Sequence, residues 1–485
     1  MLIYISIITS FFVLFFSGIA DAKYLYVDIA TGNDAVTYND NSANRPWSTI
    51  GRAAWGSTSR SSPNSSQAAK AGDTVIVRSG TYNAAASSGQ RYEPAYNPIN
   101  SGLAGNPITF KSEGIVYLRS TNASGPVIGA LNKNYIIWDG FIIDEQFVNT
   151  IPDTGPVVLW SANNCEIRNC NIKGFARWTD NHNAIRLEYT NNCIVRNNIL
   201  WNVWDAAGIN LNAAAIMTYA TKDVLIEHNE IYNCETGIYL KGPSGGANIN
   251  ERATVRYNLI RNTGVQGIEA HRQYVAYIYQ NVIRDAYQGR SASGIRVINF
   301  PNDPYGPSPA NIRIVNNVIK GMYTALSIAV SSSGTGHLIY NNIIANVNDV
   351  YDALSTETAR FSNKSVIDVE HNIYYSFRSI GNIGGNWYAF SSYKSTTGQD
   401  AAFPSSSNVD PLFVNLELND FHLRTGSPAS NAGIDVLDLN GNGNTTDRIS
   451  AGAYITGTEV IGPTTGVFPP TPSGIISPPT GLRIQ

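Results

Sequence analysis

A short pattern recurs along the chain: Ile or Val, two variable residues, Asn, one further residue, then Ile or Leu. Six copies follow it fully (VRNNIL, IEHNEI, VRYNLI, IYQNVI, IVNNVI and IYNNII), while VEHNIY ends in Tyr and an earlier IRNCNI has Cys170 in the Asn position. Steps of 23 to 36 residues separate the Asn residues, a period typical of stacked repeats. They are Asn198, Asn229, Asn258, Asn281, Asn317, Asn342 and Asn372.

The repeats predict an all-β fold, a parallel β-helix in which each repeat contributes strands to one turn of a coil, here called a rung. An Asn amide both donates and accepts hydrogen bonds, and Asn tolerates left-handed backbone geometry. We therefore expect one Asn at each equivalent bend, left-handed and hydrogen-bonded into a ladder along the stack. A β-propeller or a leucine-rich repeat would need a more constant period and its own signature residues.

A second set of strands precedes the Asn strands: AIRLEY, AIMTYA, GIYLKG, GIEAHR and GIRVIN. If the Ile of each points inward, period-two alternation sends the first and third residues after it outward. Six of these ten outward residues are charged or His, against 14% charge in the whole chain. They are Arg186, Glu188, Met217, Tyr219, Tyr239, Lys241, Glu269, His271, Arg296 and Ile298.

A neighbouring outward column, taken from the second position of the Asn motif, reads Arg168, Arg196, Glu227, Arg256 and Tyr279. Two basic strips would then flank one groove. On a chain of net charge −3 this local concentration indicates an anionic partner, because a cleft focuses the field of its own charges. We expect no nucleic acid, which would need a broader basic balance and a recognisable module. The alternative is a solvated outer face of a repeat protein.

For an acidic polysaccharide the matching reaction is β-elimination, in which the site neutralises a uronate carboxylate and supplies a base. Lys241 is the expected base, since like-charged neighbours would favour its neutral form. Arg272 and Arg296 are the expected carboxylate clamps, with Tyr219 or His271 as proton donor. The expected substrate-binding residues are Arg186, Glu188, Tyr239, Glu269, Arg296 and Arg256.

The ends of the chain suggest how the stack is closed. YLYVDIATGNDA, RPWSTIGRAAW and AKAGDTVIVRSGTYN read as strand, short amphipathic helix and strand, and such a helix can cover the open end of the stack. This order resembles the entrance of secreted pectate-lyase-like β-helix proteins, and DPLFVNLELNDFHLRTGSPASNAG resembles their closing segment. The resemblance covers most of residues 23–455 and implies a right-handed parallel β-helix with an N-terminal capping helix.

The stretch KGPSGGANINERATVRYNLIRNTGVQGIEAHR resembles a part of the alginate lyase and chondroitinase B family. In that family a Lys serves as base, an Arg one rung on assists, and calcium held by Glu and Asn neutralises the uronate. By the resemblance, Lys241 takes the place of the Lys and Arg272 that of the Arg. Here the order is His271-Arg272 where the family has Arg then His, and Glu235 alone stands where the family has two Glu residues.

Two other functions remain open. A non-catalytic glycan-binding or adhesin-like solenoid would use the same groove for recognition. A glycoside hydrolase needs two carboxyls roughly 5 to 9.5 Å apart. Glu188 and Glu269, three rungs apart, would be separated by about 14 Å or more. A hydrolase pair would therefore come from loops, where Asp180 and Asp205 are expected.

The segment DLNGNGNTTD offers a candidate calcium loop. Asp438, Asn440 and Asn442 match the first oxygen ligands of such a loop, and Gly443 allows the sharp turn. The twelfth position is Ile449, so Asp447 would have to supply the closing acid. The alternative is an Asn-Gly turn without metal.

The outer parts of the chain and its four cysteines point to export. Residues 1–22 combine an apolar run with the small-residue pattern Ala20-Asp21-Ala22 and are expected to be a signal peptide, an uncleaved anchor being the alternative. We expect a secreted or cell-surface monomer, with one β-helix domain over 23–455 and a Pro/Gly/Thr-rich tail over 456–485. Cys165 and Cys193 should stack on adjacent rungs, either as a disulfide or as two free buried thiols.

Overall fold

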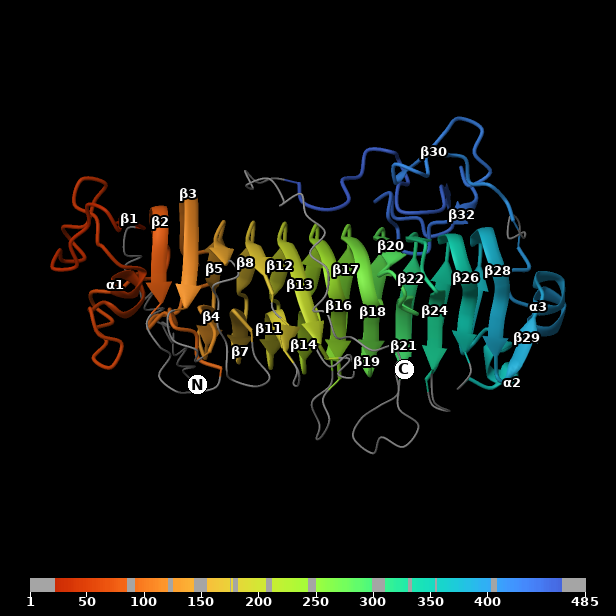
Figure 1. Ribbon diagram of the computed structural model, residues 1–485, viewed down its shortest axis with the longest axis horizontal. Coiled ribbons are helices and arrows are strands. Elements are labelled where there is room, and N and C mark those ends of the chain that lie inside the picture. Colours follow the sequence, from red (N-terminus) through yellow and green to blue (C-terminus); the bar gives the residue numbers. More distant parts are fainter. Residues whose placement is uncertain are drawn as a thin grey trace, which may run out of the picture.

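Stacked parallel strands form one long coil in the computed structural model (Figure 1). It describes residues 22–84, 92–120, 125–143, 155–174, 176–177, 182–205, 212–242, 250–298, 310–329, 334–353, 356–402 and 408–464. Each rung has three sides, here called A, B and C in chain order. On every side a strand pairs in parallel with its equivalent one rung away, as Ile185 does with Ile216 and Val195 with Ile226. The predicted parallel β-helix is confirmed.

The strands fall on the three sides as follows. Side A consists of β4 (Ile128–Leu131), β7 (Val157–Trp160), β11 (Asn183–Glu188), β14 (Ala214–Tyr219), β21 (Ser293–Ile298), β24 (Thr324–Ala329) and the second halves of β16 (Glu230–Lys241), β18 (Leu259–His271), β26 (Ile343–Ala353) and β28 (Ile373–Ile383). Side B consists of β1 (Tyr24–Val27), the first halves of β2 (Thr74–Ala84) and β3 (Ile108–Ser120), and β5 (Ile136–Asp139), β8 (Glu166–Arg168), β12 (Ile194–Arg196), β15 (Leu225–Glu227), β17 (Asn250–Arg256), β19 (Gln273–Tyr279), β22 (Ala310–Val315), β25 (His337–Tyr340) and β27 (Ile367–Glu370). Side C consists of the remaining halves of β2, β3, β16, β18, β26 and β28, with β6 (Ile142–Ile143), β9 (Asn171–Lys173), β10 (Ala176–Arg177), β13 (Ile199–Asp205), β20 (Val282–Ala286) and β23 (Val318–Lys320).

Aliphatic side chains fill the inside of the coil. The Ile residues that the sequence placed inward on side A are paired rung to rung and are fully buried. Period-two alternation thus assigns the inner and outer faces of this side correctly. The stacked residues are Ile185, Ile216, Ile238, Ile268 and Ile295.

The Asn ladder runs along the bend between sides B and C. The backbone N–H of Asn198 donates to Oδ1 of Asn229 at 3.0 Å, and the same bond repeats from each ladder Asn to the next as far as Asn372. The predicted ladder is confirmed, but the expectation of left-handed ladder residues is wrong. The residue before each Asn carries the positive φ, for example 55° at Asn197 and 56° at Tyr257.

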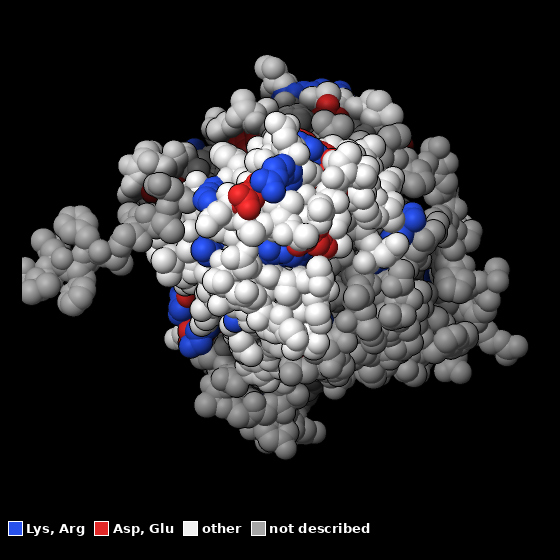
Figure 2. All heavy atoms as spheres, turned by 90° about the vertical axis from the view of Figure 1, so that its left-hand side faces the viewer, with Lys and Arg blue, Asp and Glu red and all other residues white. Residues whose placement is uncertain are grey.

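The N-terminal end is closed as predicted by a helix. In α1 (Ile50–Trp55) the Thr49 side chain accepts a hydrogen bond from the N–H of Arg52, and Gly56 ends the helix with φ 72°. Every residue of α1 is buried, and the Arg52 guanidinium lies 4.7 Å from the centre of the Trp47 ring. Figure 2 views this end and shows a mostly uncharged described surface, on which the basic and acidic side chains form several small separate groups.

The other end of the chain closes the coil and then returns along it. The short helices α2 (Thr358–Phe361) and α3 (Phe390–Thr397) lie with β29 (Asn386–Tyr388) at the far end (Figure 1). Two small hairpins follow, β30 (Phe413–Asn415) with β31 (Asp420–Leu423) and β32 (Gly433–Ile434) with β33 (Arg448–Ile449). Phe413 and Phe421 pack with Val318 and Ile343 from side C in a second apolar cluster.

Beyond β33 the chain runs back along the B–C bend. Asn316 donates to the carbonyl oxygen of Gly452 at 3.1 Å, the N–H of Gly462 donates to Tyr257 at 2.8 Å, and Thr464 donates to the Asn197 side chain. Residues 456–464, the start of the predicted tail, thus lie against the coil, and residues 465–485 lie outside the described residues. The predicted signal peptide also falls outside them, except for Ala22. Among the described residues, no helix has the length and apolar character to span a membrane.

Candidate functional site

The outer face of side A brings the predicted site residues together in two columns. One column runs Arg186, Met217, Tyr239, Glu269 and Arg296, each paired with the next on the neighbouring rung. The other column runs Glu188, Tyr219 and Lys241, and continues through His271 to Ile298. Neighbouring strands are about 4.8 Å apart, so side chains in one column are immediate neighbours.

Burial separates these residues into two groups. Lys241, Arg296 and Tyr219 are half-buried and reach the surface. Tyr239, Glu269 and His271 are at most 5% exposed. The site therefore has two cations and a phenol at its surface above a buried layer of titratable groups.

The buried layer is held by contacts between neighbouring rungs. The Tyr239 hydroxyl lies 3.3 Å from Nδ1 of His271, and the two rings are stacked with centroids 6.3 Å apart. Nη1 of Arg296 lies 3.8 Å from Oε2 of Glu269. The ammonium of Lys241 lies 5.8 Å from the centre of the Tyr239 ring, within reach of a cation–π attraction. A side-chain hydrogen bond between Tyr239 and Glu269 connects these groups, so one contact network joins all five residues.

Burial has opposite effects on the two strongest acid–base groups of the layer. It raises the pKa of Glu269 to about 7, although Arg296, Tyr239 and Lys241 favour the carboxylate. It lowers the pKa of His271 to about 3, helped by the positive charges of Arg272, Lys241 and Arg296. At neutral pH the His271 imidazole is therefore uncharged. His271 thus adds no positive charge beside Lys241.

Arg272 follows His271 at the end of β18 and is 2% exposed. Its backbone is left-handed, with φ 51°. The Arg272 side chain also lies against Gly242: a Cβ added to Gly242 would be 2.3 Å from Cβ and 3.0 Å from Cδ of Arg272. Burial lowers the pKa of the guanidinium. Arg272 is thus packed beneath the chain that follows Lys241.

Arg186 and Glu188, predicted to bind substrate, are buried and bind each other. Nε of Arg186 donates to Oε1 of Glu188 at 2.6 Å, and Nη2 forms a second contact with the same oxygen. Nη1 of Arg186 donates to Asn183 at 3.1 Å. The two charges cancel each other at the N-terminal side of the Lys241 cluster.

The second predicted strip, on side B, has the expected register, but acidic side chains pair with its arginines. Arg196 pairs with Glu166 at 2.7 Å, and Arg256 pairs with Glu227 at 2.7 Å. Arg256 also donates to the Tyr279 hydroxyl at 3.0 Å. The prediction of a basic strip on this side is wrong, because sequence position gives the column but not the acids that enter it from neighbouring positions.

Among the described carboxylates considered for a hydrolase, Asp205 is the one that lies elsewhere than expected. Glu188 and Glu269 lie on β11 and β18 with β14 and β16 between them, so the spacing argument against this pair holds. Asp180 lies outside the described residues. Asp205 is the last residue of β13 rather than part of a loop, and its backbone N–H donates a hydrogen bond to Glu235 on the next rung. Burial and the Asp205 charge raise the pKa of Glu235 to about 7, against the influence of Arg290.

The predicted calcium loop folds around Asp447. Its carboxylate accepts hydrogen bonds from the side-chain amides of Asn440, Asn442 and Asn444. The Asp438 carboxylate accepts the N–H of Gly443 at 3.0 Å. The amide groups of Asn440 and Asn442 would have to rotate before their oxygens could bind a metal. As it stands, the loop has the geometry of a hydrogen-bonded Asn-Gly turn. Among the described residues no group of three or more His, Cys, Asp and Glu side chains is arranged to hold a metal ion.

All four cysteines are free and buried. Cys165 and Cys193 precede the paired residues Glu166 and Ile194 and so stack on adjacent rungs, as predicted. Of the two alternatives for this pair, the structure has free thiols.

Comparison with known proteins supports the fold. A family described as a right-handed β-helix region matches residues 148–303. No curated protein matches the chain. Similar solved structures include the pectate lyase Pel9A, with 13% identity, 90% of this chain and 97% of that chain covered, and a TM-score of 0.46.

A second similar structure is PfbA, a surface adhesin of Streptococcus pneumoniae, with 12% identity, 62% and 77% coverage, and a TM-score of 0.47. A third is the PL6 family polysaccharide lyase Pedsa3628 from Pseudopedobacter saltans, with 12% identity, 71% and 90% coverage, and a TM-score of 0.40. These similarities concern the fold alone. The chain is a right-handed parallel β-helix.

Proposed function

We propose that this protein cleaves a uronate-containing polysaccharide by β-elimination on side A. The observation that carries the proposal is the pair of half-buried cations, Lys241 and Arg296, above the buried Tyr239, Glu269 and His271. Arg272 adds a third positive charge from below, while the imidazole is neutral. Even with Lys241 deprotonated and Glu269 ionised, the two arginine charges exceed the one negative charge of the cluster, which suits an anionic sugar.

In the proposed reaction, Arg296 neutralises the uronate carboxylate, and the buried charge of Arg272 strengthens the field at the same place. Neutral Lys241 removes the proton from the carbon beside the carboxylate. The electron pair of that C–H bond forms a C=C bond, and the bond to the glycosidic oxygen breaks. Tyr219, the half-buried neighbour of Lys241 in its column, gives a proton to the departing oxygen. The product has an unsaturated uronate at its new end.

The neutral imidazole of His271 changes the role expected for it. A group with a pKa of about 3 is a poor store of a transferable proton at neutral pH. We therefore assign His271, with Tyr239, to positioning beneath Lys241 and assign the proton transfer to Tyr219. Glu269 affects Lys241 through its charge, since an ionised Glu269 favours the protonated amine.

The test is to incubate the mature protein with pectate, alginate and dermatan or chondroitin sulfate, with and without chelator, and to follow ultraviolet absorbance of the unsaturated product. We expect a rise on one polymer that Lys241→Ala abolishes while most binding is kept. Lys222→Ala is the matched control, because Lys222 is half-exposed and pairs with Glu251 on side B. No rise on any polymer, with retention on one of them in affinity electrophoresis, would establish a binding solenoid.

A second candidate, glycoside hydrolysis, is favoured by the pair of Asp205 and Glu235. The two acids lie on adjacent rungs, near enough for the Asp205 charge to raise the pKa of Glu235, and this raised pKa suits a general acid. Both side chains are 1% exposed, which ranks this pair behind Lys241. New reducing ends without ultraviolet absorbance, lost in Glu235→Gln, would support the hydrolase.

A further inference from the structure

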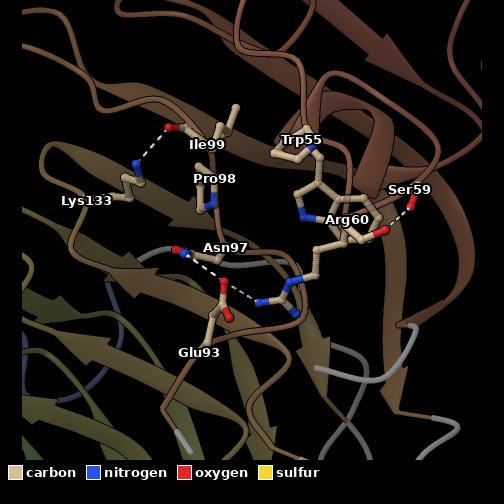
Figure 3. Close-up of a pocket in the computed structure, with 10 residues that line it drawn as sticks. Trp55, Ser59, Arg60, Glu93, Asn97, Pro98, Ile99 and Lys133 are labelled. Atoms are coloured by element: carbon tan, nitrogen blue, oxygen red, sulfur yellow. Dashed lines mark hydrogen bonds and ion pairs between the residues drawn. The ribbon is translucent and has the colours of Figure 1, made fainter. Parts of the chain in front are cut away.

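A cavity of about 510 Å³ lies where the N-terminal cap meets the first rungs (Figure 3). Its walls come from the end of α1, the segment after it, residues 93–99 before β3 and the turn between β4 and β5. Trp55, Pro98 and Ile99 give it an apolar side, and Arg60, Glu93 and Lys133 give it charges. We call this cavity the cap pocket. Its volume is in the range of small-molecule sites.

Two buried donors in the cap pocket lack an acceptor. Nε1 of Trp55 and Nη1 of Arg60 have no hydrogen-bond partner among the described residues. Trp55 is 8% exposed, and its ring is stacked on that of Tyr96, with the ring centroids 6.2 Å apart. Figure 3 shows the nitrogen-bearing edge of the indole turned toward the space between Asn97, Pro98 and the Arg60 side chain. Buried donors normally have partners, so these two point to a ligand with acceptor oxygens.

The charges of the cap pocket add to one positive unit. Nη2 of Arg60 lies 2.7 Å from Oε1 of Glu93, so these two charges offset each other. Lys133 donates one hydrogen bond, to the carbonyl oxygen of Ile99 at 2.8 Å, and an ammonium has three N–H groups. The pocket thus combines an apolar wall, free donor capacity and one net positive charge. This combination suits a hydroxylated ring that carries one carboxylate.

The cap pocket and Lys241 lie at the same bend of the coil. Lys133 is in the turn after β4, and Lys241 ends β16, four rungs farther along side A. That separation is about 19 Å along the coil. Aromatic side chains occupy the space between, with Trp160 against Tyr189 at 5.2 Å and Tyr189 against Tyr219 at 6.0 Å between ring centroids. Tyr189 is 39% exposed, so the series has an accessible face on which sugar rings could stack.

We infer that the cap pocket binds one carboxylate-bearing sugar unit of the polysaccharide whose chain passes over Tyr189 to Lys241. The inference rests on the proposed function for the identity of the polymer. The chemistry of the pocket by itself calls for a uronate sugar. A unit held there fixes the register of the chain against Lys241 and contributes affinity without contact with the reacting atoms.

The test measures binding by calorimetry to Lys241→Ala, which prevents turnover. The probes are the saturated disaccharides of galacturonate, mannuronate and glucuronate, with neutral digalactose as control. We expect one uronate disaccharide to bind at least tenfold more tightly than digalactose. Trp55→Phe, which keeps a smaller aromatic ring and removes the N–H, should weaken that binding about tenfold, and Arg60→Gln should do the same from a different segment. Circular dichroism and thermal melting verify that both variants fold.

The inference is overturned if no uronate disaccharide binds, or if neither variant weakens the binding. Failure of the proposed function would give a different result. If turnover survives in Lys241→Ala, Lys241 is not the base, but the uronate disaccharide should still bind to the cap pocket and Trp55→Phe should still weaken that binding. With Lys241 intact, Trp55→Phe should raise KM for long chains and leave kcat unaltered. A fall in kcat alone would contradict a pocket remote from the chemistry.

Discussion

Replacement of Glu269 by Gln should stabilise the protein at alkaline pH and remove a large part of its pH dependence. The carboxyl has an ordinary pKa of 4.5 and a folded-state pKa of about 7 because it is buried. A carboxyl whose pKa is raised by folding stabilises the fold fully below 4.5, and this contribution is lost as the pH rises through 7. A difference of about 2.5 pH units corresponds to about 3 kcal/mol. Gln has the same shape and no charge, so it does not suffer this loss.

The assay is urea denaturation of wild type and Glu269→Gln at pH 5 and pH 8.5, followed by circular dichroism. The wild type should lose about 2 to 3 kcal/mol more than the variant between the two pH values. Glu235→Gln should show a similar effect, since burial and Asp205 raise the pKa of Glu235 to about 7 as well. Glu113→Gln is the control, because its side chain is 61% exposed. Equal pH dependence in wild type and Glu269→Gln would refute the argument from burial.

His271 titrates in the opposite sense. Its folded-state pKa of about 3 lies below the ordinary 6.5, so protonation of the unfolded chain lowers stability as the pH falls from 6.5 toward 3. This contribution is present in wild type and in Glu269→Gln alike. Comparison of the two proteins at each pH therefore isolates the carboxyl.

Three further predictions concern stability. Asn258→Ala should cost about 2 to 6 kcal/mol, because it leaves the N–H of Asn229 and the carbonyl oxygen of Ile226 buried without partners; a urea midpoint no lower than that of the exposed control Asn386→Ala would contradict this. Arg186→Met should cost about 3 to 5 kcal/mol, since Glu188 would stay buried without its cation, and adding Glu188→Gln should recover much of the loss in the same titration. The hydrogen bonds within residues 438–447 predict a melting temperature that neither millimolar calcium nor chelator changes; a rise with calcium that is lost in Asp438→Asn would show a metal site.

Much of the fold could be predicted because it repeats. The recurring Asn residues show which segments are equivalent from rung to rung. Period-two alternation around Ile238 and Ile268 then predicts the outward columns, and the structure has the same register. The left-handed residue is not the ladder Asn, as predicted, but the residue before it. The prediction fails because an Asn amide suits both a ladder and a turn. The ladder uses the side chain of Asn258, while Tyr257 makes the turn.

The electrostatics of the candidate site could not be predicted from the columns. Alternation gives the face on which a side chain lies but not its burial or its partner. Arg186 and Glu188 are two residues apart in one strand, and burial makes them a pair rather than two ligands. The same burial makes His271 neutral. The cap pocket could not be predicted either, because Trp55 and Lys133 are far apart in sequence and each has an ordinary structural role.

The Asn ladder also bears on how a chain like this changes its length. Each ladder amide bonds only to the rungs directly before and after it, so the chemistry at one rung is independent of the total number of rungs. A duplicated or deleted segment that spans one whole Asn-to-Asn step rejoins the ladder without an orphaned group, whatever the size of its loops. An insertion or deletion of one residue between side B and side C would instead move the Asn amide out of the bend. Buried polar groups would then lack partners on two rungs. Length variation among such proteins should therefore occur in whole turns, with each new turn adding about 4.8 Å of outer surface on which binding residues can diversify.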